Sequence, residues 1–253
     1  MCSSSHRVED QLLEDDRMED IETISDSDTY WEQKIPNDYE ETLKLSKVSL
    51  KWKTKEELYS ILCKGFLLDN GYQWFSVDKN GEKCQMLSAR AAVIADNNSN
   101  WESSNESRFG EVLVITCSYK FQIQRRIEPQ EVSPETTYAA FLVYKLPQDQ
   151  STFEAPIHVY DENAKYSRES FIYLVSPPVT PVIGPKFDEN TDNPLNRYKG
   201  NAIPQQRTDG WMEVKVWDFQ TTTESVPMHL FFKHPGEKNL SGLMIQGIEL
   251  RPI

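Results

Sequence analysis

The stretch TTYAAFLVYKL, residues 136–146, decides the fold class. Side chains of a β-strand alternate between the two faces of its sheet, so the stretch divides into two sets. One face carries Tyr138, Ala140, Leu142 and Tyr144, and the other carries Ala139, Phe141, Val143 and Lys145. A strand that is this apolar on both faces lies in the middle of a sheet that is covered on both sides. The stretch therefore predicts a central strand.

Further strand candidates flank this segment at short intervals. They are rich in aromatic and β-branched residues and are separated by Pro, Gly, Asn and Asp. They cover 72–87, 90–94, 111–127, 156–161, 170–175, 211–219, 227–232 and 243–251. The first of them contains Asn80-Gly81, a dipeptide that favours a β-hairpin. Many short strands with little helix predict an all-β fold, an antiparallel, jelly-roll-like β-sandwich.

The last strand candidate, 243–251, is predicted as regular. Its alternation sets Leu243, Ile245 and Gly247 on one face and Met244, Gln246 and Ile248 on the other. Period-2 alternation of this kind indicates a strand whose two faces have different surroundings.

A short helical segment is predicted ahead of the strands, over residues 36–70. Asp38, followed three residues later by Glu41, has the pattern of a capping box. Thr54 is a second candidate N-cap, and Leu58 opens an apolar face that recurs at helical spacing. The simplest role for that face is packing against the β domain that follows.

Residues 1–35 are acidic and rich in serine, a composition typical of a disordered tail. The chain of 253 residues has a formal net charge of −13. Ten acidic residues and two arginines within residues 1–30 account for −8, which leaves −5 for the rest. Nucleic acid binding needs a basic face, so no nucleic acid partner is expected.

Targeting signals are not recognisable in the sequence. No stretch approaches the roughly 18 consecutive apolar residues that a membrane-spanning helix needs. No apolar region follows the first Met, so a secretory signal is not expected. These features predict a protein that is not secreted. The widely spaced cysteines are expected as reduced thiols.

Catalytic motifs are also not recognisable. There is no G-x-S-x-G elbow, no phosphate-binding loop and no glycine-rich dinucleotide turn. The four histidines lack metal-ligand spacing. We therefore expect no catalytic residues, no cofactor and no metal site, and a protein that is not an enzyme. A pair of carboxylates that acts on a glycosidic bond stays open, because such a pair is set in space.

One tryptophan stands apart from the strand pattern. In IADNNSNWESSNES, residues 94–107, Trp101 has no apolar neighbour between Asp96 and Ser107. We predict that it lies in a loop. The loop either folds the ring inward or holds it out for a ligand, and the residues themselves leave both interpretations open.

From about residue 54 onward the sequence resembles plant phloem protein 2 and the Nictaba-like lectins. The landmarks are KEELYSILCKGFLLDNG, KCQMLSARA, ESRFGEV, IEPQEVSPETTYAAFLVYKL, RTDGWMEVKVWDF and SGLMIQGIELRPI. Each is weak alone, but their order and spacing make the resemblance specific. It identifies residues 71–253 as a β-sandwich lectin domain.

This resemblance implies a non-catalytic lectin of the plant cytosol and nucleus, in stress, defence or phloem biology. The implied ligands are N-acetylglucosamine oligomers and the cores of N-glycans, so the expected partners are glycans or glycoproteins that contain N-acetylglucosamine. The sequence leaves open whether the chain forms a homodimer. Many family members carry an F-box ahead of the lectin domain. None is expected here, because IPNDYEETLKLSK, residues 35–47, is too short and polar to form one.

Sugar recognition needs an aromatic ring that stacks on the pyranose and fixed polar groups that bind its hydroxyls. In the family, the loop after the LSAR motif carries several tryptophans that are implicated in sugar binding. Here Asp96 or its neighbour stands where the first is expected, and Trp101 matches a later one. Ser103 stands where the next would be, and Asn97 adds an amide beside them.

A second family feature is a set of acids in the penultimate strand and in the turn before it. Glu224 lies in that turn, and either Lys233 or Phe232 falls where a glutamate is expected. The candidate carbohydrate-binding residues are therefore Trp101, Asp96, Asn97, Ser103, Glu224 and Lys233.

Much of the expected sugar chemistry is thus altered, and three interpretations stay open. The domain binds a different or weaker glycan through Trp101 with Asp96 and Asn97. Alternatively, it binds the usual ligands through other residues. In the third interpretation it has lost sugar binding and is a protein–protein interaction module on a lectin scaffold.

Overall fold

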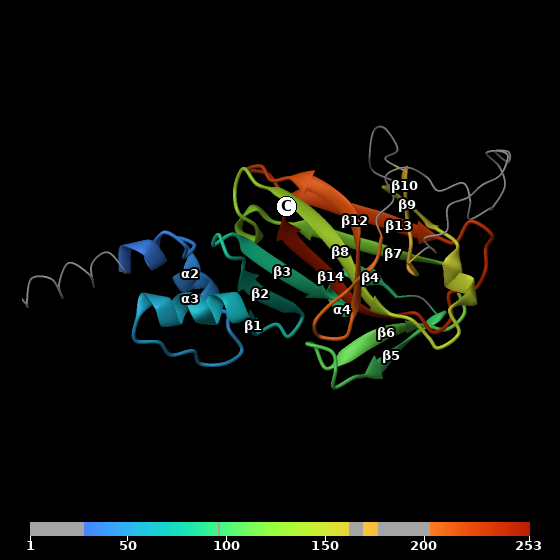
Figure 1. Cartoon of the computed structure of the whole chain (residues 1–253), viewed down its shortest axis with the longest axis horizontal. Helices are drawn as coiled ribbons and strands as arrows, with labels where there is room; N and C mark the ends of the chain where they lie inside the picture. The colour runs from blue at the N-terminus through green and yellow to red at the C-terminus, as the bar shows by residue number, and fades with distance from the viewer. Residues whose placement is uncertain (1–27, 96, 162–168, 177–202) are drawn as a thin grey trace, which may run out of the picture.

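Strand β8 (Thr137–Lys145) lies inside the larger of two antiparallel sheets, as its sequence predicts. The computed structural model describes residues 28–95, 97–161, 169–176 and 203–253. The two sheets stack as an open sandwich, with a helical segment at one end (Figure 1). The predicted all-β, antiparallel sandwich fold is therefore confirmed.

The two sheets are built from strands that are far apart in the sequence. The larger runs in the order β1 (Phe66–Leu67), β2 (Gln73–Val77), β3 (Lys83–Ser88), β14 (Met244–Pro252), β8, β12 (Met212–Gln220) and β11 (Gln205–Gln206). A branch of β6 (Glu111–Ile115) and β5 (Ser99–Ser103) pairs with the start of β14. The smaller runs in the order β10 (Glu169–Ile172), β9 (Ile157–Asp161), β13 (Val226–Lys233), β7 (Lys120–Ile127) and β4 (Val93–Ile94). Short 3-10 helices lie at η1 (Pro129–Glu131) and η2 (Ser151–Glu154).

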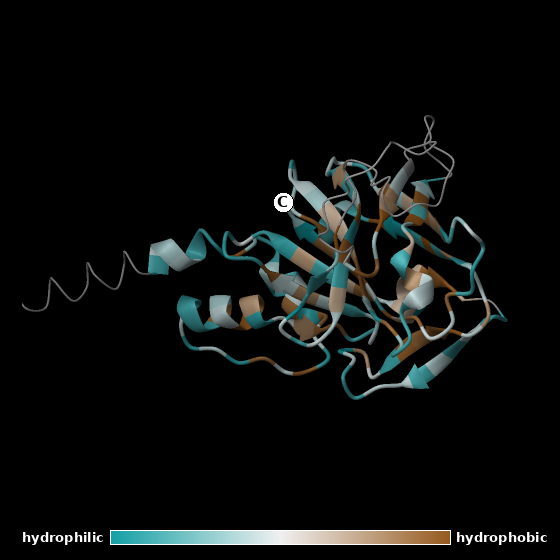
Figure 2. Ribbon diagram, turned by 45° about the vertical axis from the view of Figure 1, so that its right-hand side comes forward, coloured by the Kyte–Doolittle hydropathy of each residue, from teal (hydrophilic) through white to brown (hydrophobic). Residues whose placement is uncertain are grey.

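The main core lies between the sheets, where the apolar residues gather in Figure 2. From β8 it receives Tyr138, Ala140, Leu142 and Tyr144, all fully buried. From the smaller sheet it receives Ile123, Leu230 and Phe232, among others. The hydroxyl groups of the two tyrosines donate to backbone carbonyls, so these side chains are buried without losing their hydrogen bonds.

The opposite, outer face of the larger sheet is also partly covered. Trp211, just before β12, packs there against Met86, Val143 and two valines of β6. Its indole nitrogen donates to the carbonyl of Glu106 at 3.1 Å. Burial of Ala139 and Val143 on this face confirms that β8 is covered on both sides.

Strand β14 departs from the regular alternation that its sequence predicts. The register against β8 shifts between Ile245 and Gly247, so Ile248 joins Ile245 in the main core instead of facing away from it. Gln246 is the extra residue at this bulge and is fully buried. Gly247 lies where β14 comes very close to the backbone carbonyl of Leu87 in its neighbour β3. The predicted regular strand is therefore wrong at this point.

The helical segment contains α2 (Tyr39–Lys44) and α3 (Lys55–Lys64). Helix α3 begins as predicted, because the Thr54 hydroxyl accepts the Glu57 backbone N–H at 3.1 Å. Leu58 and Leu62 are fully buried in a second core. That core also contains Ile35, Phe66, Leu68, Phe75 and Val77, so the segment packs on the β1–β2 end of the larger sheet.

Helix α2 is not capped as predicted. The Asp38 carboxylate makes no cap hydrogen bond and instead pairs with the Lys83 ammonium at 2.6 Å. This pair ties the helical segment to β3, and the expected capping box is wrong. Upstream, residues 28–32 are helical and Ile35 is buried. The described structure thus starts before the predicted boundary at residue 36, while 1–27 lie outside the described residues.

The close approach of the Leu87 carbonyl to Gly247 can be tested by substitution. A Cβ at this position would lie 1.9 Å from the carbonyl oxygen of Leu87, and backbone cannot move aside cheaply. We expect Gly247→Ala to lower the free energy of unfolding by about 2 kcal/mol or more. Urea denaturation measures the change. Ser103→Ala, on the exposed end of β5, is the control and should stay near the wild type. An unchanged midpoint for Gly247→Ala would contradict the close approach of the Leu87 carbonyl to this position.

Candidate functional site

Trp101 lies in a strand and not in the loop that the sequence predicts. It is the middle residue of β5, directly opposite Leu113 of β6. Its side chain is half-buried and packs on the edge of the main core. The polar neighbours that made it look isolated are the exposed residues of an edge strand. Of the two interpretations that the sequence left open, the inward one describes the ring.

A guanidinium group lies over the Trp101 ring. Arg90 belongs to α4 (Ala89–Ala92), a single helical turn where the sequence predicted a strand over 90–94. Its guanidinium carbon lies 4.0 Å from the ring centroid, a cation–π contact. Arg90 also binds the Glu111 carboxylate through two hydrogen bonds of 2.5 and 2.6 Å, which lower the pKa of Glu111. A sugar that stacks on this ring from the Arg90 side would have to displace that clamp.

Three turns meet at one end of the sandwich and form what we call the loop rim. They contain Asn97 and Asn98, Cys117 to Lys120, and Lys233 to Leu240. The Asn98 carbonyl accepts the backbone N–H groups of Thr116 and Cys117, at 2.8 and 3.2 Å. The Asn239 side chain accepts the Ser118 N–H at 3.1 Å, which joins the second turn to the third.

The loop rim brings together two of the predicted residues. Asn97 is exposed there, and Lys233 lies at its other side, with its ammonium 5.6 Å from the centre of the Tyr119 ring. Lys233 also pairs with Glu237 at 3.0 Å, and this hydrogen bond raises the pKa of Lys233. Lys120 approaches the same ring to 5.7 Å. Tyr119 is therefore an aromatic ring with two cations near it.

The other predicted residues are spread along the sheets. Ser103 is exposed at the far end of β5, two residues beyond Trp101. Glu224 is exposed in the turn before β13, while Lys233 ends that strand. At about 3.3 Å per residue, the strand separates the two by roughly 25 Å. Glu224 thus does not join the loop rim, and Asp96 lies outside the described residues.

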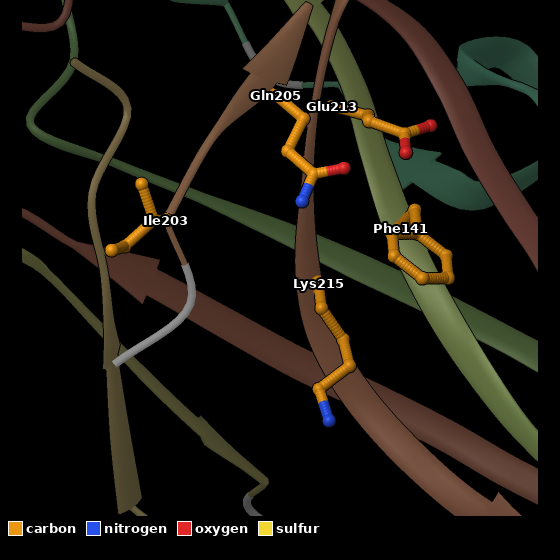
Figure 3. Close-up of a pocket in the computed structure, with 5 residues that line it drawn as sticks. All are labelled: Phe141, Ile203, Gln205, Glu213 and Lys215. Atoms are coloured by element: carbon orange, nitrogen blue, oxygen red, sulfur yellow. The ribbon is translucent and has the colours of Figure 1, made fainter. Parts of the chain in front are cut away.

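A cavity of about 220 Å³ lies on the outer face of the larger sheet. It is lined by Phe141 of β8, Glu213 and Lys215 of β12, and Gln205 and Ile203 at β11 (Figure 3). Strand pairing places these side chains together, since Phe141 is opposite Lys215 and Gln205 is opposite Glu213. An apolar ring beside fixed polar groups is the arrangement that sugar-binding sites use.

A network of four charged side chains, Glu213, Arg207, Arg251 and Glu249, lies next to this cavity. The Glu213 carboxylate accepts from Arg207 at 2.8 Å and from Arg251 at 2.5 and 2.9 Å. Arg207 also pairs with Glu249, and the Arg251 guanidinium lies 3.6 Å from the centre of the Phe141 ring. Burial alone would raise the pKa of Glu213, but the hydrogen bonds and charges of the two arginines outweigh it and hold that pKa below its ordinary value.

The sequence contained a signal for this cavity that strand prediction did not use. In the segment 211–219, Glu213 and Lys215 alternate with the core-facing residues Val214 and Val216. Charged side chains on a strand next to the central one must either meet solvent or pair with each other. Arg251 lies 38 positions from Glu213, and Glu249 lies 42 positions from Arg207, so the network could not be assembled from local spacing.

The described residues contain no group of three or more His, Cys, Asp and Glu side chains that could hold a metal ion. Within the same residues, no helix is long and apolar enough to cross a membrane.

Comparison with known proteins gives a consistent family. Residues 82–252 match the family model of phloem protein 2. A putative F-box protein PP2-B8 of Arabidopsis thaliana is 31% identical over 248 residues, which cover 89% of this chain and 75% of that protein. The F-box protein VBF of Arabidopsis thaliana is 29% identical, over 90% of this chain and 87% of that protein. The F-box protein SKIP3 of Arabidopsis thaliana is 30% identical, over 92% and 78%.

Among solved structures, the chain is similar to a Cry1Da tryptic core variant of Bacillus thuringiensis. The identity is 8% and the TM-score 0.37, over 75% of this chain and 30% of that one.

The depressed pKa of Glu213 leads to a pH-dependent prediction. A carboxylate whose pKa is lower in the folded state contributes stability above its ordinary value near 4.5 and loses it as the pH falls through the folded value. Glu213→Gln removes the carboxylate that binds both arginines, so it should lower the free energy of unfolding by about 3 kcal/mol at pH 7. The difference from wild type should shrink as the pH is lowered below about 4.5.

Urea denaturation across this pH range measures the difference. Glu102→Gln, at an exposed position of β5, should differ little from wild type at any pH. A cost for Glu213→Gln that is the same at pH 3 and pH 7 would contradict the role assigned to the charge.

Proposed function

The chain belongs to the phloem protein 2 family, and from this premise we propose that it is a non-catalytic carbohydrate-binding protein. Its ligands are N-acetylglucosamine oligomers or the cores of N-glycans, carried by glycans or glycoproteins. The observation that carries the proposal is the family match over residues 82–252, which covers the smaller sheet, the larger sheet from β3 onward and the loop rim. The setting that fits such a lectin is the plant cytosol or nucleus, in stress, defence or phloem biology.

The loop rim is the best-supported place for the sugar among the predicted residues. Tyr119 offers an aromatic ring, while Asn97 and Asn239 offer amide groups, and Lys233 offers a donor. Planar rings beside amide groups suit an N-acetylated pyranose, because the ring stacks and the amide binds the acetamido group. Trp101 lies a short way along β5 from this rim, behind the Arg90 clamp.

A protein–protein interaction module is the second candidate function. Two observations favour it: the Arg90 guanidinium covers the one predicted stacking ring, and the three relatives are named F-box proteins. In this candidate function the lectin scaffold remains and the sugar site does not. A partner that stays bound in the presence of excess free glycan would support it.

A glycan array with the purified full chain tests the lectin proposal. We expect binding to at least one N-acetylglucosamine oligomer or N-glycan core, at ligand concentrations up to a few mM, since a small site supports weak affinity. Chito-oligomers should be recovered uncleaved. No binding to any of these ligands by chain that circular dichroism shows to be folded would overturn the proposal.

Two substitutions decide the role of Trp101. If the ring stacks on sugar, Trp101→Ala should weaken binding by roughly 1 kcal/mol, about fivefold in Kd. Arg90→Ala should strengthen binding, because the ring is then uncovered without loss of the tryptophan. Trp52→Ala, an exposed tryptophan of the helical segment, is the matched control. Unchanged affinity in both Trp101→Ala and Arg90→Ala would remove Trp101 from the site and leave the loop rim.

A further inference from the structure

The outer-face cavity of the larger sheet lies apart from the residues that the sequence assigns to sugar binding. Trp101, Asn97 and Lys233 belong to β5, the loop rim and the end of β13, whereas the cavity lies over β8, β12 and β11. In Figure 3, Phe141 and Ile203 stand on opposite sides, Gln205 and Lys215 lie between them, and the Glu213 carboxylate lies on the Phe141 side. Two apolar side chains with polar groups beside them suit a ring with polar substituents at its edge.

The volume limits the ligand to one ring. At about 220 Å³ the cavity is smaller than the roughly 300–1,000 Å³ of sites for drug-sized molecules. An oligosaccharide does not fit, but its terminal residue does.

Glu213 sets the charge that the ligand can carry. Its side chain is 9% exposed, and its two oxygens accept three hydrogen bonds from Arg207 and Arg251. The carboxylate is therefore ionised and already neutralised by two cations. An ammonium group placed against it would meet those arginines at close range, which disfavours amines and amino acids. A hydroxyl group can still donate to the carboxylate without a charge conflict.

Lys215 supplies the one charge in the cavity lining that can change partner. Its ammonium pairs with Asp218 at 3.3 Å, and both side chains are at least a third exposed. An exposed pair of this kind contributes little to stability, so a carboxylate in the cavity can compete for the ammonium. The lining thus offers a cation at one end and a hydroxyl acceptor at the other.

We propose that this cavity binds a uronic acid residue, a pyranose that carries a carboxylate on its ring. The ring packs against Ile203 and against the part of Phe141 that the Arg251 guanidinium leaves open to the cavity, its carboxylate binds the Lys215 ammonium, and a hydroxyl donates to Glu213. The proposal rests on the proposed carbohydrate-binding function and adds to it a second site for an acidic sugar, separate from the loop rim.

Isothermal titration calorimetry with the full chain and three ligands tests it. Galacturonate is the acidic sugar, galactose is its neutral match, and chitotriose reports on the proposed lectin site. We expect galacturonate to bind at least roughly tenfold more tightly than galactose, because a charge-assisted contact is made only by the acid. Galacturonate binding should weaken as salt is raised.

Substitutions at Lys215 locate the site. Lys215→Met should reduce galacturonate affinity by roughly tenfold or more and leave chitotriose binding unchanged, whereas Lys215→Arg should retain most of the affinity. Lys51→Met removes an exposed lysine of the helical segment and should change neither ligand. Unfolding midpoints of all variants show that the fold is kept.

The possible failures are distinguishable. Chitotriose binding without galacturonate binding overturns the acidic-sugar site and leaves the lectin proposal standing. Galacturonate binding that is equal in wild type and Lys215→Met, or equal to that of galactose, also overturns the site. Failure of both ligands overturns the site and the lectin proposal together.

Discussion

Burial of both faces of β8 is the constraint on which the rest of the structure depends. Its inner face carries tyrosines whose hydroxyl groups still reach backbone carbonyls, so the sandwich closes without unpaired polar groups at that strand. Its outer face carries Val143, which must be covered, and Trp211 covers it from the neighbouring strand connection. That cover ends near Phe141, and from there the outer face is held by charges that pair with one another.

The charge network follows from this arrangement. Glu213 and Glu249 occupy strands on either side of β8, and each would be costly to leave unpaired in a half-buried position. Arg207 and Arg251 reach them across the sheet, and Arg251 also covers one ring, Phe141. Because the carboxylates are held from several sides, their oxygens stay fixed in place. A fixed acceptor beside an aromatic ring is what a small polar ligand needs, and this sheet obtains it from the pairing that stabilises it.

The sequence predicted the layered fold because its signals are local and repeated. Alternation in 136–146, the Asn80-Gly81 hairpin and the Thr54 cap each depend on a few neighbouring residues. The features that the sequence predicted wrongly depend on residues that are distant in the sequence. The bulge at Gln246 arises where β14 changes partner from β6 to β3, and no local pattern records that exchange. The Asp38 carboxylate does not cap its helix and instead pairs with Lys83, a residue 45 positions away.

The candidate site was harder to predict than the fold for the same reason. Trp101 looked isolated because its neighbours in sequence are polar, yet its neighbours in space are Leu113, Arg90 and the edge of the core. Glu224 and Lys233 lie nine positions apart in sequence, but an extended strand carries them to opposite ends of the sheet. Residues on a strand gather by cross-strand register and not by sequence distance. Side chains from distant segments of a sandwich therefore come together where several strands or turns meet, as they do at the loop rim and at the outer-face cavity.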